Sequence, residues 1–150
     1  MYARSETRRI GLFAGILLLA LAAGCGNKNT SPTPVLTTDT LSGTLAVLGA
    51  SSQSFTVNYQ LSYSDAAVKV TSLRTVANPT DVTKTIGVGF GSIAFDGSCA
   101  RSTTYTATAA NINQVLTASG IFTSGVYCVQ IFDSGTLTEP VTYTMEVQHY

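Results

Sequence analysis

The 150-residue sequence has no tryptophan, a single histidine and few charged residues, which make up only 11% of the chain. It contains no H-E-x-x-H or G-x-S-x-G motif, and its GVGFG stretch lacks the spacing and the lysine of a phosphate-binding P-loop. A Ser-His-Asp triad would have to use His149, the penultimate residue, which we expect to be frayed. Because no catalytic constellation is recognisable, we predict that the protein is not an enzyme and uses no cofactor.

Basic residues are also scarce. The chain has eight Lys and Arg against eight Asp and Glu, and Arg4, Arg8, Arg9 and Glu6 all lie within the first 24 residues. The remainder therefore holds five basic and seven acidic residues. Binding to phosphate backbones needs a basic patch, so the composition excludes nucleic acid as a partner.

The longest uncharged apolar run, from Ile10 to Ala23, has 14 residues, whereas a membrane-spanning helix needs about 20. Arg8 and Arg9 precede this run and small residues follow it, which is the order of a secretory signal. The ending LAAGC, residues 21–25, resembles the lipobox of bacterial lipoproteins. In that family the cysteine, here Cys25, receives a diacylglyceryl group and becomes the new N-terminus, with palmitate as an expected acyl chain.

Three other interpretations of this segment were weighed. A retained transmembrane helix would be too short, a buried core helix would lack a polar face, and an ordinary signal peptide cut after Gly24 would leave Cys25 free. Neither Gly26 nor Asn27 is an aspartate, which favours the outer membrane in Gram-negative sorting. We expect residues 1–24 to be removed and the protein to be anchored through Cys25 in the bacterial cell envelope, facing the periplasm or the cell surface.

The lipidated cysteine and a flexible linker are expected to occupy residues 25–40. Residues 26–38, GNKNTSPTPVLTT, are small, polar and proline-containing, and a coil of this length spans on the order of 20 Å. Residues 41–150 then form a single domain, which is long enough to bury a core.

Within residues 41–150 the sequence favours strands over helices, since Thr, Ser, Gly, Val and Ala dominate and apolar residues alternate with polar ones. The clearest alternation places Val141, Tyr143, Met145 and Val147 on one face. Strands are expected at residues 41–48, 54–63, 66–74, 86–91, 103–109, 112–118, 125–132 and 141–149. We predict an all-β fold, a single antiparallel β-sandwich of about eight strands with jelly-roll or Ig-like topology.

Two of these strands have special compositions. Gly87, Gly89 and Gly91 alternate with apolar residues, which leaves one face bare and permits close approach of another backbone or a bulge. Residues 125–132, GVYCVQIF, are apolar on both faces except for Gln130, which is typical of a central strand.

With Cys25 lipidated, Cys99 and Cys128 remain as an even pair in a compartment that permits oxidation. We predict a disulfide between them, which would stabilise the fold by roughly 3 to 4 kcal/mol. A metal site would need more ligands nearby, and a reactive thiol would leave the second cysteine unexplained.

The sequence GVYCVQIFDSGTLTEPVTYTMEVQHY, together with GFGSIAFDGSC upstream, resembles the end of bacterial pre-peptidase C-terminal domains. The resemblance covers roughly residues 43–150 and depends mainly on Gly125, Tyr127, Val129 and the strand containing Tyr143. It implies a small β-sandwich of the kind found beside secreted hydrolases or on lipoproteins, and some of these domains bind calcium or polymers. Loop aspartates are the calcium candidates that follow from it: Asp65, Asp96 and Asp133. Turn capping is the favoured explanation for each of them, so we predict no metal site.

The tyrosines are candidates for stacking on sugars. Tyr59, Tyr63 and Tyr143 share the parity of core positions, which leaves Tyr105 and Tyr150 as the exposed candidates. The leading functional prediction is a non-catalytic binding module of the cell envelope, directed at a glycan, an envelope polymer or a protein. The alternative is a structural subunit that self-assembles through its sheet edges.

Overall fold

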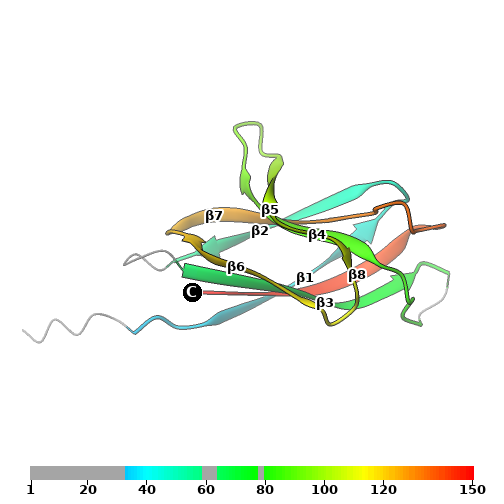
Figure 1. Ribbon diagram of the computed structural model, residues 1–150, viewed down its shortest axis with the longest axis horizontal. Coiled ribbons are helices and arrows are strands. Elements are labelled where there is room, and N and C mark those ends of the chain that lie inside the picture. The colour runs from blue at the N-terminus through cyan, green and yellow to red at the C-terminus, as the bar shows by residue number, and fades with distance from the viewer. Residues whose placement is uncertain (1–32, 59–63, 78–79) are drawn as a thin grey trace, which may run out of the picture. The chain divides into compact units, whose positions relative to one another are not determined.

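Alternating side chains build eight strands in the computed structural model, which describes residues 33–58, 64–77 and 80–150 (Figure 1). The strands are β1 (Thr37–Leu45), β2 (Ala50–Val57), β3 (Ser64–Thr75), β4 (Ile86–Ile93), β5 (Cys99–Ala110), β6 (Val115–Phe122), β7 (Gly125–Phe132) and β8 (Val141–His149). They belong to one compact unit, Pro34–Tyr150. These described residues contain no helix that is both long and apolar enough to cross a bilayer.

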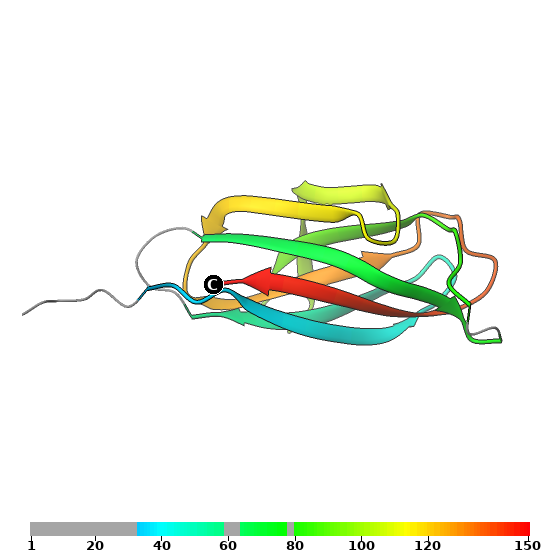
Figure 2. The same ribbon diagram turned by 90° about the horizontal axis from the view of Figure 1, so that it is seen from below.

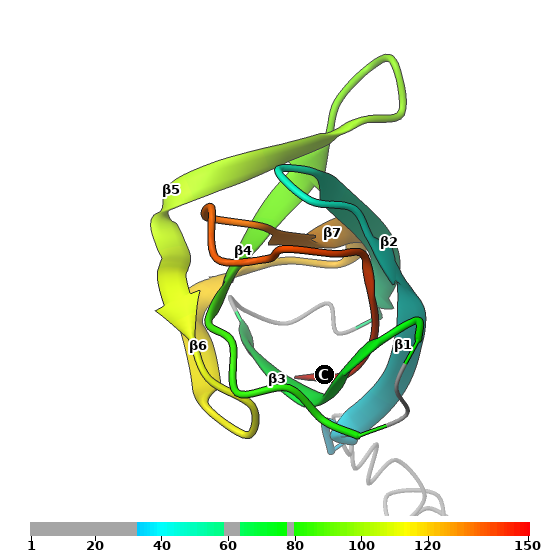
Figure 3. The ribbon, with the colours of Figure 1, turned by 90° about the vertical axis from the view of Figure 1, so that its right-hand side faces the viewer.

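Two antiparallel four-stranded sheets pack face to face, with strand orders β1-β8-β3-β6 and β2-β7-β4-β5. Figure 2 shows the strands running along the long direction of the domain, and the end-on view in Figure 3 shows the sheets enclosing a common interior. At one edge β1 lies beside β2, and at the other β5 lies beside β6. The predicted β-sandwich is confirmed.

The inner faces of the two sheets form the core. Val141, Tyr143, Met145 and Val147 of β8 are buried, as their alternation predicted. An aromatic cluster fills one end of the interior, where the ring of Phe55 lies 5.9 Å from Phe90, 5.8 Å from Phe122, 6.1 Å from Tyr127 and 5.3 Å from His149. Aromatic pairs at such distances contribute stability beyond their buried area.

Several boundaries differ from the prediction. The expected linker through residue 40 is too long, since β1 begins at Thr37 and pairs with β8 from Thr37↔His149 onward. Its first residues are polar because β1 is an edge strand, and the hydrophobic pattern therefore did not reveal it. β2 begins at Ala50, inside an expected turn, and Asp65 lies within β3 rather than at a turn. The signal segment with Cys25, and Tyr59 and Tyr63, lie outside the described residues.

The glycines of β4 allow close packing on the outer face of the second sheet. The ring of Phe132 lies directly against Gly87, and the backbone of Ala100 lies against Gly91, so a side chain at either position would collide with its neighbour. The guanidinium carbon of Arg101 then lies 3.7 Å from the centroid of the Phe132 ring, a cation–π contact. The predicted close approach at these glycines is confirmed, and the approaching group is a side chain at Gly87 and a backbone at Gly91.

Replacing Gly87 by alanine is expected to lower the free energy of unfolding by about 2 kcal/mol, because the new methyl group overlaps the Phe132 ring. Equilibrium denaturation of the variant measures this loss. When Phe132 is also replaced by alanine, the Gly87→Ala change should lower the free energy of unfolding by less than it does in the natural protein. Equal costs in the two backgrounds would contradict the proposed overlap.

Candidate ligand-binding groove

A cavity of about 220 Å³ opens at the edge of the sandwich where β5 and β6 lie side by side. We call it the β5–β6 groove. Aromatic and aliphatic side chains from four strands form most of its wall, and its lining residues are Phe90, Gly91, Ser92, Ala100, Ser102, Tyr105, Ile121, Phe122 and Tyr127. A cavity of this volume can hold one large apolar side chain or a small ligand group.

Two β-bulges shape this groove. Between Gly89↔Thr106 and Gly91↔Arg101, a single residue of β4 faces the four residues 102–105 of β5. Between Ser64↔Phe122 and Ala66↔Ala118, Asp65 alone faces the three residues 119–121 of β6. These irregularities bring lining residues of both edge strands to the groove. Bulges occur preferentially next to functional sites, because they redirect side chains.

The β6 bulge is held by a specific contact. The backbone N–H of Gly120 donates to Oδ1 of Asp65 at 2.7 Å, and Gly120 has a φ of +68°, a conformation that other residues rarely adopt. Asp65, a predicted calcium candidate, therefore positions the strand segment that carries Ile121. The contact that the structure shows for Asp65 is this hydrogen bond to the backbone.

The tyrosines of the groove are only partly buried. Tyr127 is fixed, since its hydroxyl accepts a hydrogen bond from the backbone N–H of Thr123 at 3.0 Å and lies 3.1 Å from the hydroxyl of the same residue. Its ring also lies 4.8 Å from Phe122, nearly perpendicular to it. Tyr105, predicted as an exposed stacking candidate, is half-buried in the wall of the groove. A preformed aromatic wall costs little conformational entropy when a ligand binds.

The hairpin between β4 and β5 stands away from the rest of the domain (Figures 1 and 3). The predicted disulfide between Cys99 and Cys128 is present, with its Cα atoms 5.8 Å apart, and it joins the start of β5 to β7. Phe95, near the tip of the hairpin, is fully exposed. A disulfide-fixed hairpin therefore presents a phenyl ring to the solvent beside the groove.

The other two predicted calcium candidates cap turns. Asp96 accepts hydrogen bonds from the hydroxyl and the backbone N–H of Ser98 in the hairpin turn, and these bonds hold the pKa of Asp96 below its ordinary value. Asp133 is buried, which by itself raises its pKa, but the N–H groups of Leu48, Thr136, Leu137 and Gly135 outweigh that effect and lower it. N–H donors occupy both carboxylate oxygens of Asp133 and Oδ1 of Asp96, and no cluster of three metal-ligating side chains occurs within residues 33–58, 64–77 and 80–150.

The prediction that His149 is frayed is wrong. Its side chain is buried at 3% exposure, and its Nε2 lies 3.0 Å from Oδ2 of Asp39 in β1. Its Nδ1 is buried without a hydrogen-bond partner among the described residues. The β1–β8 pairing, which the sequence pattern missed, explains why the end of the chain is ordered. The ring of His149 packs in the core, 5.3 Å from the ring of Phe55.

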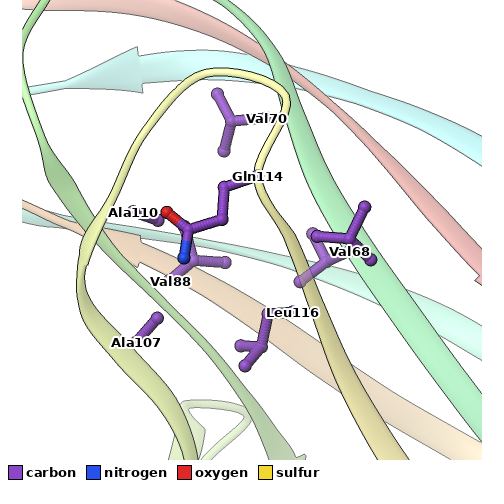
Figure 4. A pocket seen from close by; sticks show the side chains of 8 residues that line it. Val68, Val70, Val88, Ala107, Ala110, Gln114 and Leu116 are labelled. Carbon is purple, nitrogen blue, oxygen red and sulfur yellow. The ribbon is translucent and has the colours of Figure 1, made fainter.

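A second cavity lies between β3, β4, β5 and β6, but its volume is only about 30 Å³. Figure 4 shows the Gln114 side chain among Val70, Val88 and Ala110. The amide oxygen of Gln114 accepts a hydrogen bond from the backbone N–H of Asn111 at 3.1 Å. The cavity is of the size of a water molecule and is too small for an organic ligand.

No protein-family model matches the chain, and no curated protein matches it. Among solved structures it is similar to PliG of Aeromonas hydrophila, a periplasmic inhibitor of g-type lysozyme. The identity is 11%, the match covers 75% of this chain and 86% of that chain, and the TM-score is 0.44. A likeness at this level identifies no family and assigns no ligand.

Residues that sequence reasoning missed include Ile121 and Phe122, which lie beyond the strand expected at 112–118, and the exposed Phe95. One signal was available, since a glycine inside a strand pattern indicates a bulge, and Gly120 lies in β6. The β5 bulge has no such marker, because Ser-Thr-Thr-Tyr is an ordinary strand sequence.

Proposed function

We propose that the protein is a non-catalytic binding module of the bacterial cell envelope, anchored to the membrane through a lipid on Cys25. Its ligand is a protein that places an apolar or aromatic side chain in the β5–β6 groove. The observation that carries the proposal is the groove itself, an apolar cavity of about 220 Å³ shaped by two bulges and walled by Tyr105 and Tyr127.

The chemistry of the lining favours a protein over a glycan. Sugars need several side-chain donors and acceptors, whereas the hydroxyls of Ser92 and Ser102 are the polar groups here besides the tyrosines. The hydroxyl of Tyr127 is already engaged by Thr123. Aromatic anchors in a desolvated pocket are typical of the energetic centres of protein interfaces.

The lipobox-like sequence ending at Cys25 supports the anchored location, and the motifs around Tyr127 and Tyr143 support a pre-peptidase C-terminal-like domain. Mass spectrometry of the exported protein tests the anchor. A diacylglyceryl-modified N-terminal Cys25 is expected, and an unmodified cysteine would contradict it.

Photo-crosslinking tests the groove. With p-benzoylphenylalanine at position 105 of the full-length protein, expressed in a lipoprotein-processing bacterium, we expect a protein adduct in the envelope. Ile121→Arg places a charge in the groove and should lower the adduct yield at least about tenfold. Thr117→Arg, on an exposed position of the same strand, is the matched control and should leave the yield unchanged. Adducts to glycan alone, or no adduct at all, would refute the protein-binding function.

A further inference from the structure

We propose that the protein bound in the β5–β6 groove is a second copy of this chain, which inserts Phe95 of its β4–β5 hairpin. The inference rests on the proposed function, since it names the partner of the same groove. The sequence predicted self-assembly through sheet edges. The contact proposed here is the insertion of a side chain into a groove rather than the pairing of two edge strands. The bulges in β5 and β6 interrupt those two edges, which disfavours pairing of their backbones with another chain.

Phe95 and the groove are complementary in size and chemistry. The phenyl ring is fully exposed in the free domain, so burying it in an apolar cavity of about 220 Å³ is favourable because apolar surface is removed from water. The Cys99–Cys128 disulfide holds the base of the hairpin, so that little flexibility is lost when the ring is buried.

If two copies are related by a two-fold axis, each can insert its Phe95 into the groove of the other. The residues Gly91, Ser92, Ala100 and Ser102 at the base of the hairpin line the groove, and Phe95 follows Gly91 by four residues, about 13 Å along an extended strand. In an antiparallel pair of hairpins, each tip therefore lies beside the base of the other. Contacts of this reciprocal kind close on themselves as dimers rather than continuing as filaments.

Charge complementarity points to the same arrangement. Asp96 directly follows Phe95 at the tip, and Arg101 lies at the base of the hairpin, where its guanidinium stacks on the Phe132 ring on the outer face of the sheet. Within the described residues, Glu146, Asp81 and Asp39 form ion pairs with Lys69, Arg74 and His149, and no acidic side chain there pairs with Arg101. Asp96 accepts hydrogen bonds from Ser98 through Oδ1, and its Oδ2 has no hydrogen bond or ion pair with any described residue. In the reciprocal dimer the acidic tip of each copy meets the Arg101 guanidinium at the hairpin base of the other.

Crosslinking from the tip tests the dimer directly. With p-benzoylphenylalanine in place of Phe95 in the full-length protein, we expect a covalent dimer in the envelope, with the adduct on residues 121–127. The same photoreactive residue in place of Leu48, an exposed residue between β1 and β2, is the matched control and should give at least about tenfold less dimer. No dimer, or a dimer joined through other residues, would overturn the proposal.

Charge exchange gives an independent readout. Asp96→Arg and Arg101→Asp should each lower the yield of the dimer about fivefold or more, and the double variant should restore it to within about twofold. Absence of restoration would overturn the reciprocal contact. If position 105 captures a different protein while position 95 gives no dimer, the groove still binds protein and only the identity of the partner is wrong. If position 105 captures nothing, the proposed function itself fails.

Discussion

Replacing Asp133 by alanine is expected to lower the free energy of unfolding by about 3 to 5 kcal/mol, although the residue lies in a loop. Its carboxylate accepts hydrogen bonds from four backbone N–H groups, those of Leu48, Gly135, Thr136 and Leu137, at 2.8 to 3.2 Å. The Asp133 N–H also donates to Gly49. Removing the carboxylate would leave the donors without their acceptor, and bonds to charged groups are the stronger ones.

This residue joins two loops that are distant in the sequence. Leu48 lies in the β1–β2 turn with a φ of +55°, which is unfavourable for leucine and is held by the bond to Asp133. Equilibrium denaturation of Asp133→Ala measures the effect. Asp96→Ala is the matched control, because this aspartate caps a turn at the exposed tip of the hairpin and its loss should change stability little. A similar, small loss for both variants would show that the two caps are equivalent.

The lowered pKa of Asp133 also predicts a dependence on pH. Because the carboxylate has a lower pKa in the folded than in the unfolded protein, its contribution is fully present above the unfolded value of about 4 and is lost as the pH falls through the folded value. Asp133→Asn should therefore show a smaller loss of stability between about pH 5 and pH 2 than the natural protein. Parallel stability curves for the two proteins would contradict this assignment.

Removing the disulfide is the second change with a large expected effect. In the double variant Cys99→Ala/Cys128→Ala, the free energy of unfolding should fall by about 3 to 4 kcal/mol, since the bond closes a loop across a sequence separation of 29 residues. Chemical denaturation under non-reducing conditions measures it. The natural protein with its disulfide reduced is the matched control and should lose a similar amount. A loss below about 1 kcal/mol in both would show that the bond stabilises the hairpin only.

Hydrogen exchange separates these outcomes. Amides of Ile93, Ala94 and Cys99 lie in or beside the hairpin that the disulfide fixes, whereas those of β8 belong to the centre of the first sheet. We expect faster exchange throughout the domain in the double variant, with the largest change in the hairpin. A change confined to β8 would be inconsistent with the role assigned to the disulfide.

The fold was predictable where one face of a strand is buried. β7 and β8 were predicted with their observed bounds. Their buried positions, which include Val129 and Ile131, are occupied by apolar residues, and this pattern is visible in the sequence. The predicted strand at 41–48 began four residues late and ended three residues late, and its start was missed because Thr37 to Thr40 pair through their backbones at an edge, where polar side chains are preferred. Backbone pairing of this kind leaves no hydrophobic period to detect.

The groove could not be predicted for a related reason. Its shape depends on how many residues of β5 and β6 oppose one residue of a neighbouring strand, and register is a property of strand pairs rather than of a single segment. Tyr105 was predicted as an exposed stacking candidate and is half-buried in the groove wall, and the other wall residues Ile121 and Phe122 come from a different sheet. The ordering of His149 likewise required knowledge that β1 lies beside β8.

The position of the first strand has a mechanical consequence. The described chain enters the sandwich at Thr37, opposite His149, and His149 contacts Phe55, whose ring also contacts Phe122 and Tyr127 of the groove. A pulling force between a membrane anchor and a partner in the groove would therefore act on one end of β1. The backbone hydrogen bonds between β1 and β8 would then break one after another instead of bearing the force together. The contact between Asp39 and His149 lies at that end of the ladder and would be among the first to break.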